Sequence, residues 1–192
     1  MNNRVVLAFS GGLDTSFCVP YLIKKRGLEV HTVMVNTGGF SKEEEKKIEE
    51  RAMMLGATSH KNIDAVEEYY QKGIRYLLFG NILKNSTYPL SVSSERVFQA
   101  LALLREVRAL EASYVAHGST AAGNDQVRFD LVFEILSPST KILAPIRELK
   151  LSRKEEIEYL KQSGLELSWD KAKYSINQGL WGTSVGGAET LT

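Results

Sequence analysis

Segment 8–16, with the sequence AFSGGLDTS, constrains the fold of this chain more than any other stretch. It follows a short apolar run at 4–8 and precedes a segment with a helical pattern. Glycines at a strand-to-helix turn let backbone N–H groups approach an anion, and the helix N-terminus adds positive potential. The alternative is a glycine turn that merely joins the two elements. Because Ser10, Asp14 and Ser16 accompany the glycines, the segment favours a phosphate site.

The glycine turn differs from two common nucleotide-binding loops. A Walker A loop ends on a Lys-Ser/Thr pair, which segment 8–16 lacks, and a dinucleotide-binding loop has the spacing Gly-x-Gly-x-x-Gly. Segment 8–16 instead resembles the Ser-Gly-Gly-x-Asp-Ser/Thr pyrophosphate loop of the ATP pyrophosphatases, which convert ATP to AMP and pyrophosphate. Hydroxyl groups of Ser10, Thr15 and Ser16 would add donors to such a loop. Asp14 has the same charge as a phosphate, so we expect it to hold Mg²⁺ or to orient a donor.

Strand and helix patterns alternate along the chain, which predicts an α/β fold. Apolar or β-branched runs predict five strands, at 4–8, 29–35, 58–63, 113–116 and 141–144. Helices are expected at 15–26, 41–55, 65–78, 95–111 and 125–136, and from a capping box at Ser152 to a point before Gly164. We therefore expect an open, mainly parallel five-stranded sheet with helices on both faces.

Three stretches fit this pattern poorly. Pro20 lies within the first helix and is tolerated there only if that helix starts near Ser16 or Phe17. Residues 80–94 carry turn residues and little periodicity, which predicts a long active-site loop. Residues after Gly164 are expected to be irregular. The charged run 43–51 is expected to be a solvated helix face.

A strand order of 3-2-1-4-5 would place the first and fourth strands side by side. Ligands of open parallel sheets bind beyond the carboxyl ends of the strands, where the strand order reverses. Segment 8–16 follows the first strand, and a second glycine-bearing loop at 117–123 follows the fourth. We expect both loops to reach one nucleotide. His117, at the start of the second loop, is either a loop residue that contacts the ligand or a satisfied hydrogen-bonding group.

A second candidate site lies at 124–128. Arg128 offers a bidentate fork for a carboxylate, Asn124 offers amide donors and an acceptor, and Asp125 can take an ammonium group. Asn124 and Arg128 would share one helical face. The alternative is an ordinary helix start, with Asn124 as the cap and Asp125 facing the helix dipole.

The bulk properties exclude several classes. A formal net charge of +1 gives no general attraction to nucleic acid or to an anionic membrane, and no apolar run is long enough to span a bilayer. Cys18 is the one cysteine, which excludes an intrachain disulfide and fits a cytoplasmic protein. We expect Cys18 to be a small buried residue rather than a nucleophile. The lack of a His/Cys cluster argues against zinc, so magnesium carried by phosphates is the expected metal.

Three segments together are similar to the argininosuccinate synthase family: 8–16, 114–129 and 174–182. The resemblance runs from residue 4 to the last residue, and 124–129 is its most specific part. It implies an adenine nucleotide alpha hydrolase-like fold with the same strand order. It also implies a ligase of arginine biosynthesis, which activates citrulline with ATP, lets aspartate displace AMP, and assembles as a homotetramer.

The resemblance assigns ligand contacts by position. ATP contacts fall on Ala8, Phe9, Ser10, Gly11, Gly12, Leu13, Asp14, Thr15, Ser16, Val35, His117 and Gly118. Aspartate contacts fall on Thr120, Asn124 and Asp125, and citrulline contacts on Tyr88, Ser93, Asn124, Arg128, Ser175 and Ser184. No dedicated covalent nucleophile is implied, so the catalytic residues stay unknown.

The chain also departs from the family pattern. Ala121 and Ala122 stand where the family usually has a glycine and often has a lysine. The residues around Tyr88, Ser93 and Arg96 differ from the family motif, although these three residues themselves match it. The small polar residues at 186–192 fall near the middle of the family's polypeptide. We therefore expect a fragment or a truncated or split gene, with a nucleotide-binding domain at 1–165 and the start of a truncated synthetase domain at 166–192. The remaining citrulline ligands would then be missing and the tetramer doubtful.

Three functions stay open at this stage. The first is an ATP-dependent ligase of the argininosuccinate synthase type, whole or partial. The second is another pyrophosphate-loop enzyme, although a thiolating one would want more cysteines and a tRNA-modifying one a basic surface. The third is a nucleotide-binding remnant, or a half that depends on a partner and has no activity alone.

Overall fold

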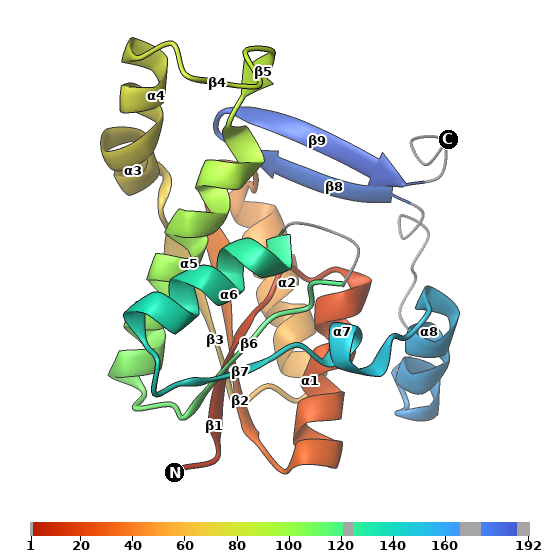
Figure 1. Cartoon of the computed structure of the whole chain (residues 1–192). Coiled ribbons are helices and arrows are strands. Elements are labelled where there is room, and N and C mark those ends of the chain that lie inside the picture. Colours follow the sequence, from red (N-terminus) through yellow and green to blue (C-terminus); the bar gives the residue numbers. More distant parts are fainter. Residues whose placement is uncertain (1, 121–124, 166–173, 188–192) are drawn as a thin grey trace.

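A five-stranded parallel sheet forms the centre of the molecule (Figure 1). The computed structural model describes residues 2–120, 125–165 and 174–187. The strands are β1 (Arg4–Ala8), β2 (Glu29–Asn36), β3 (Ser59–Asp64), β6 (Tyr114–Ala116) and β7 (Lys141–Leu143), and their order is β3-β2-β1-β6-β7. Every neighbouring pair in this sheet is parallel. The predicted order, 3-2-1-4-5 when these five strands are counted along the chain, is therefore confirmed.

Helices cover both faces of the sheet, as expected. Successive side chains of a strand point to opposite faces, so Val5 and Leu7 of β1 contact one core cluster while Val6 contacts the other. The first cluster includes residues of α1 (Leu13–Arg26), α2 (Lys42–Met54), α7 (Pro145–Leu149) and α8 (Arg153–Gln162). The second includes residues of α5 (Ser91–Ala109) and α6 (Asp125–Leu136).

The prediction for the first helix was wrong at its start. α1 begins at Leu13, directly after Gly12, and Pro20 lies in the second half of the helix. A proline inside a helix costs about 3 kcal/mol. Here the buried face of α1, which includes Phe17, Cys18 and Leu22, packs on the sheet and offsets that loss. Cys18 is buried, as predicted.

Two further stretches differ from the prediction, the first because it is less regular and the second because it is more regular. The predicted helix 65–78 is a composite of α3 (Val66–Tyr69), a π-helical turn (Tyr70–Ile74) and α4 (Arg75–Phe79). The predicted loop 80–94 holds a small hairpin of β4 (Leu83–Lys84) and β5 (Tyr88–Pro89), and α5 begins at Ser91.

The region after Gly164 also contains regular structure. Residues 174–187 form an antiparallel hairpin of β8 (Tyr174–Gly179) and β9 (Gly182–Gly187). The backbone N–H of Leu180, in its turn, donates to the carbonyl of Thr37 at 2.8 Å. A tertiary contact that reaches back 143 residues along the chain (180 minus 37) leaves no local sequence pattern. The predicted domain boundary at 165 stays a prediction. Among the described helices, none is long and apolar enough to cross a membrane.

Candidate functional site

The glycine turn at 10–12 leaves the N-terminus of α1 open to an anion. Gly11 has φ +72°, and a Cβ there would lie 3.1 Å from Ile48 Cγ1, so the position needs glycine. Gly12 is the N-cap of α1 in an extended conformation, and no side chain of the described residues caps the helix. The first-turn N–H groups of a helix have no partner within the helix. They are therefore available to a phosphate at this point.

A cation lies beside this turn that the sequence reasoning missed. The Arg51 guanidinium, from the last turn of α2, donates through Nη1 to the carbonyl oxygen of Gly11. The charged run 43–51 was predicted to be a solvated face, and for Arg51 this is wrong, since its side chain reaches the turn. Ile48 packs on the same turn from one helical turn earlier. In the sequence, this contact could have been inferred from the i, i+3 spacing of Ile48 and Arg51, which places both side chains on one face of the helix.

The second loop touches the start of α1. A Cβ on Gly118 would lie 3.0 Å from Thr15 Cγ2, 3.1 Å from Thr15 N and 3.2 Å from the carbonyl carbon of Asp14. Gly118 is thus a glycine because the backbone of α1 approaches it closely. The contact confirms that the loops after the first and fourth strands of the sheet meet at one place. This place is the reversal of strand order, between β1 and β6.

The His117 side chain is a satisfied hydrogen-bonding group. Its ring is 1% exposed, and Nε2 lies 2.9 Å from Asp130 Oδ1. The backbone N–H of Ser119 donates to Nδ1 at 3.2 Å. Because Nδ1 accepts, the proton of the neutral ring lies on Nε2, which donates to Asp130. Arg147 holds the other oxygen of Asp130 at 2.6 Å. The ring therefore anchors the loop, and any nucleotide contact of His117 is left to its backbone.

The hydroxyl groups predicted to contact ATP differ in their exposure to solvent. Ser10 is exposed, and its Oγ lies 3.4 Å from both Gly12 N and Thr15 Oγ1. Ser16 is fully buried, and its Oγ has no hydrogen-bond partner within the part of the chain that the structure describes. Val35 is also buried, near the carboxyl end of β2. Ser10 and Thr15 are therefore the hydroxyl groups best placed to reach a phosphate.

Asp14 faces a second acid on α8. Its carboxyl group contacts that of Glu156, which is 1% exposed and adjoins Arg153. Burial raises the pKa of Asp14, and burial together with the charge of Asp14 raises the pKa of Glu156 to about 8. Two carboxyl groups bind each other when one carries a proton. Mg²⁺ binds ionised carboxylates, whereas the raised pKa values of this pair disfavour the ionisation of both groups. The geometry favours an orienting role for Asp14.

The predicted amino-acid site contains a network of charges. Arg128 donates from Nη1 to Asp125 Oδ1 at 2.7 Å, and Arg96 donates from Nε to Asp125 Oδ2 at 3.1 Å. Asp125 is thus already paired with two guanidinium groups. Ser93 lies in the first turn of α5, and Ser184 lies opposite Asn177 in the β8–β9 hairpin.

Other predicted contacts lie apart from this network or cannot be placed. Tyr88 is exposed on β5, with Lys84 Nζ 5.5 Å from its ring centroid. Thr120, in the second loop, is exposed. Three predictions lie outside the described residues: Asn124, Ala121 and Ala122. The backbone of Ser175 belongs to β8 and pairs with Gly186.

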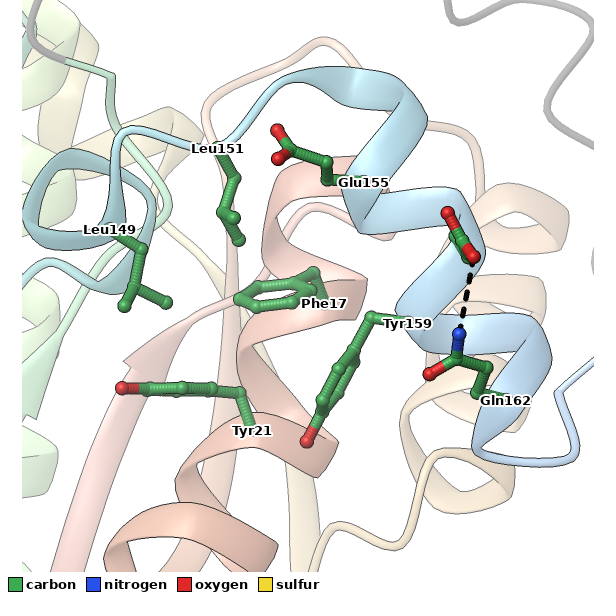
Figure 2. Close-up of a pocket in the computed structure, with 8 residues that line it drawn as sticks. Phe17, Tyr21, Leu149, Leu151, Glu155, Tyr159 and Gln162 are labelled. Atoms are coloured by element: carbon green, nitrogen blue, oxygen red, sulfur yellow. Dashed lines mark hydrogen bonds between the residues drawn. The ribbon is translucent and has the colours of Figure 1, made fainter.

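An apolar pocket of about 260 Å³ lies elsewhere, between α1, α7 and α8 (Figure 2). Phe17, Tyr21 and Tyr159 form its aromatic wall, with the ring centroids of Phe17 and Tyr159 4.9 Å apart. The pocket shares no lining residue with either glycine-bearing loop. It is therefore separate from the candidate nucleotide site.

Comparison with known proteins identifies relatives of one kind. Residues 4–166 match the family described as the arginosuccinate synthase N-terminal HUP domain. An argininosuccinate synthase of Pyrobaculum aerophilum is 43% identical over 185 residues, which are 96% of this chain and 46% of the relative. The enzyme of Methanocaldococcus jannaschii is 43% identical over 189 residues, 98% of this chain and 47% of the relative. The chain spans about half the length of these relatives.

Proposed function

Because the chain belongs to the argininosuccinate synthase family, we propose that it is the ATP-binding half of an enzyme that joins citrulline and aspartate. The products would be argininosuccinate, AMP and pyrophosphate. The observation that carries the proposal is the contact between two loops: the uncapped N-terminus of α1 and the loop at Gly118 meet at the reversal of strand order.

The turn at 10–12 suits the departure of pyrophosphate. Attack on the α-phosphorus of ATP by the citrulline ureido oxygen puts negative charge on the leaving pyrophosphate. Backbone N–H groups at the start of α1 are already oriented toward this charge, and Arg51 adds a cation through the Gly11 carbonyl. Magnesium would enter with the ATP phosphates, where it would neutralise part of their charge. A site of this kind works by positioning and needs no covalent nucleophile.

The start of α6 suits the binding of the amino acids. Arg128 would take the citrulline carboxylate, and Asp125 fixes one nitrogen of its fork at 2.7 Å. Ser93, Ser175 and Ser184 belong to the two elements beside α6, which are α5 and the β8–β9 hairpin. The aspartate contacts are proposed at Thr120, Asn124 and Asp125. Because Asp125 is paired with two arginines, its contact with the aspartate ammonium would complete an alternating chain of charges.

Because the chain is about half as long as its relatives, we propose that its activity alone is low. The matched relatives are about twice as long, so we propose that ligands from a second half complete the citrulline site. A loss of about 1 Å in positioning already costs about a hundredfold in rate. An open site also admits water, which weakens the electrostatic contacts inside it.

Turnover by the isolated chain tests this proposal. AMP release from ATP, citrulline and aspartate would be measured for the purified 192-residue chain, with the full-length Pyrobaculum aerophilum relative in parallel. We expect a rate at least about a hundredfold lower than that of the relative, together with retained ATP binding. A rate comparable to that of the relative would contradict the dependence on a second half. Loss of both turnover and ATP binding would contradict the proposed function itself.

A further inference from the structure

We propose that Arg96 is a positioning residue that sets the spacing between the three elements carrying the predicted amino-acid ligands. These elements are the start of α5, the start of α6 and the β8–β9 hairpin. The inference deepens the proposed function and rests on it for the identity of the ligands. The sequence singled out Arg96 as a residue that survives in an altered segment, and the resemblance gave it no role.

One guanidinium group joins all three elements. Arg96 donates from Nε to Asp125 Oδ2 at 3.1 Å, which reaches α6. It donates from Nη2 to Asn177 Oδ1, which reaches β8. On its own helix, Nη1 donates to Gln99 Oε1 at 2.8 Å and lies 3.3 Å from Glu95 Oε1. The side chain is 11% exposed, so water competes little for these contacts.

A second link ties the same helix to the central sheet. Glu95 is 3% exposed, and its Oε1 accepts from Thr37 Oγ1 at 2.8 Å and from Gln99 Nε2 at 2.8 Å. The Thr37 carbonyl in turn accepts from the Leu180 N–H in the hairpin turn. The hairpin is thus held at two points, at Asn177 by Arg96 and at Leu180 by Thr37. Arg96 makes the first of these contacts, and Glu95 holds the hydroxyl of the residue that makes the second.

The contact with Asp125 transmits the position of Arg96 to Arg128. Asp125 accepts Arg96 on one carboxylate oxygen and Arg128 on the other. The carboxylate of Asp125 is a rigid plane. Displacement of the Arg96 guanidinium therefore rotates this plane, and with it the orientation of the Arg128 guanidinium. Arg96 therefore acts on the predicted carboxylate ligand without touching citrulline.

The geometry requires a guanidinium rather than a positive charge alone. Arginine presents five N–H donors in one plane, whereas lysine presents a single ammonium on a flexible stem. A lysine at this position keeps the charge but cannot reach α6 and β8 together. Arg96→Lys therefore removes the link between elements and leaves the net charge unchanged.

Arg105→Lys is the matched control. Arg105 lies on the same helix and makes a two-point contact with Glu68, at 2.7 and 2.6 Å, on the exposed side. The two variants make the same chemical change, and of these two arginines Arg96 is the one that bonds to the hairpin and to α6. A non-specific effect of losing a guanidinium from α5 would therefore appear in both variants.

Two readouts on the full chain test the inference. The first is amide hydrogen exchange of the β8–β9 hairpin, compared with that of β1 and β2. We expect Arg96→Lys to speed hairpin exchange by about tenfold or more, because hydrogen bonds to a charged group are lost, and to leave β1, β2 and the ATP response unchanged. The second is the ¹⁵N resonance of Arg128 Nε during citrulline titration with a non-hydrolysable ATP analogue. We expect a saturable shift in the wild-type and Arg105→Lys chains, and its loss in Arg96→Lys.

The outcomes are distinguishable. Unchanged hairpin exchange in Arg96→Lys overturns the inference. Faster hairpin exchange with an intact citrulline response of Arg128 also overturns it, because Arg96 is then a structural clamp that does not position the ligand. If citrulline fails to shift Arg128 in the wild-type chain, the isolated half does not bind citrulline, and hairpin exchange in Arg96→Lys alone decides whether Arg96 joins the elements.

Discussion

The ATP-dependent rise in melting temperature is expected to disappear in Gly12→Val. Among the described residues, a Cβ at Gly12 meets only Ser10 Oγ, at 3.4 Å, and the backbone there is extended, so the folded chain accepts a side chain. The branches of valine would instead occupy space at the open N-terminus of α1. A ligand at a hundred times its Kd stabilises the folded state by about 2.7 kcal/mol. This whole increment should be lost. Thermal denaturation with and without ATP and magnesium measures it.

The choice of glycine matters for this experiment. Gly11 has φ +72° and lies against Ile48, so a substitution there would damage the fold and the result would not report on ATP. Gly12→Ala adds the Cβ alone and should retain part of the ATP response. The melting temperature without ATP controls for folding. A folded Gly12→Val chain with the wild-type ATP response would show that phosphates do not bind at this turn.

Glu156→Gln is expected to stabilise the chain at alkaline pH. In the folded chain the pKa of Glu156 is raised from 4.5 to about 8 by burial and by Asp14. The folded state therefore binds more protons than the unfolded state between these values, and the stability falls as the pH rises through this range. Glutamine keeps a donor toward Asp14 and does not titrate. The expected gain relative to the wild type is on the order of 3 kcal/mol at about pH 9, and smaller at about pH 5.5.

Urea denaturation of both chains at the two pH values measures this difference. Glu158→Gln is the matched control, since Glu158 is an exposed residue of α8. The charged neighbours that set the titration of Glu156 are Asp14 on α1 and Arg153 on α8. A stability difference between Glu156→Gln and the wild type that does not change with pH would contradict the proposed proton between Asp14 and Glu156.

Local patterns predicted much of the fold. Strands in a parallel sheet are apolar runs, and helix ends carry their own signals, such as the capping boxes at Ser41 and Ser152, both of which are confirmed. The strand order, which would let the two glycine-bearing loops reach one nucleotide and which the family resemblance implied, is also confirmed. These features depend on neighbouring residues, so a single sequence contains them.

Contacts between distant residues were not predictable in the same way. Arg51 reaches Gly11 across 40 positions, and Arg96 reaches Asn177 across 81. The pairing of Asp14 with Glu156 depends on how α1 and α8 pack. The prediction for Pro20 was wrong for a related reason. A proline lowers the stability of a helix locally, but the tertiary burial of α1 outweighs this loss. The ligand assignments stay predictions.

The site's electrostatic design also comes from long-range packing. The sequence predicted Arg128 as a carboxylate ligand and Asp125 as an ammonium ligand, and the structure pairs the two side chains with each other at 2.7 Å. The sequence could not show that Arg96 donates to the same carboxylate, because Arg96 and Asp125 are 29 positions apart and lie on different helices. A network of this kind is set by the fold as a whole.

Calorimetric competition between ATP and inorganic pyrophosphate tests the central claim most directly. The claim is that the phosphates of ATP bind the turn at 10–12. ATP with magnesium would be titrated into the wild-type chain, first alone and then in the presence of saturating pyrophosphate. If pyrophosphate occupies the N-terminus of α1, the apparent affinity for ATP should fall in proportion to the pyrophosphate concentration. An ATP affinity that stays the same in saturating pyrophosphate would contradict the claim.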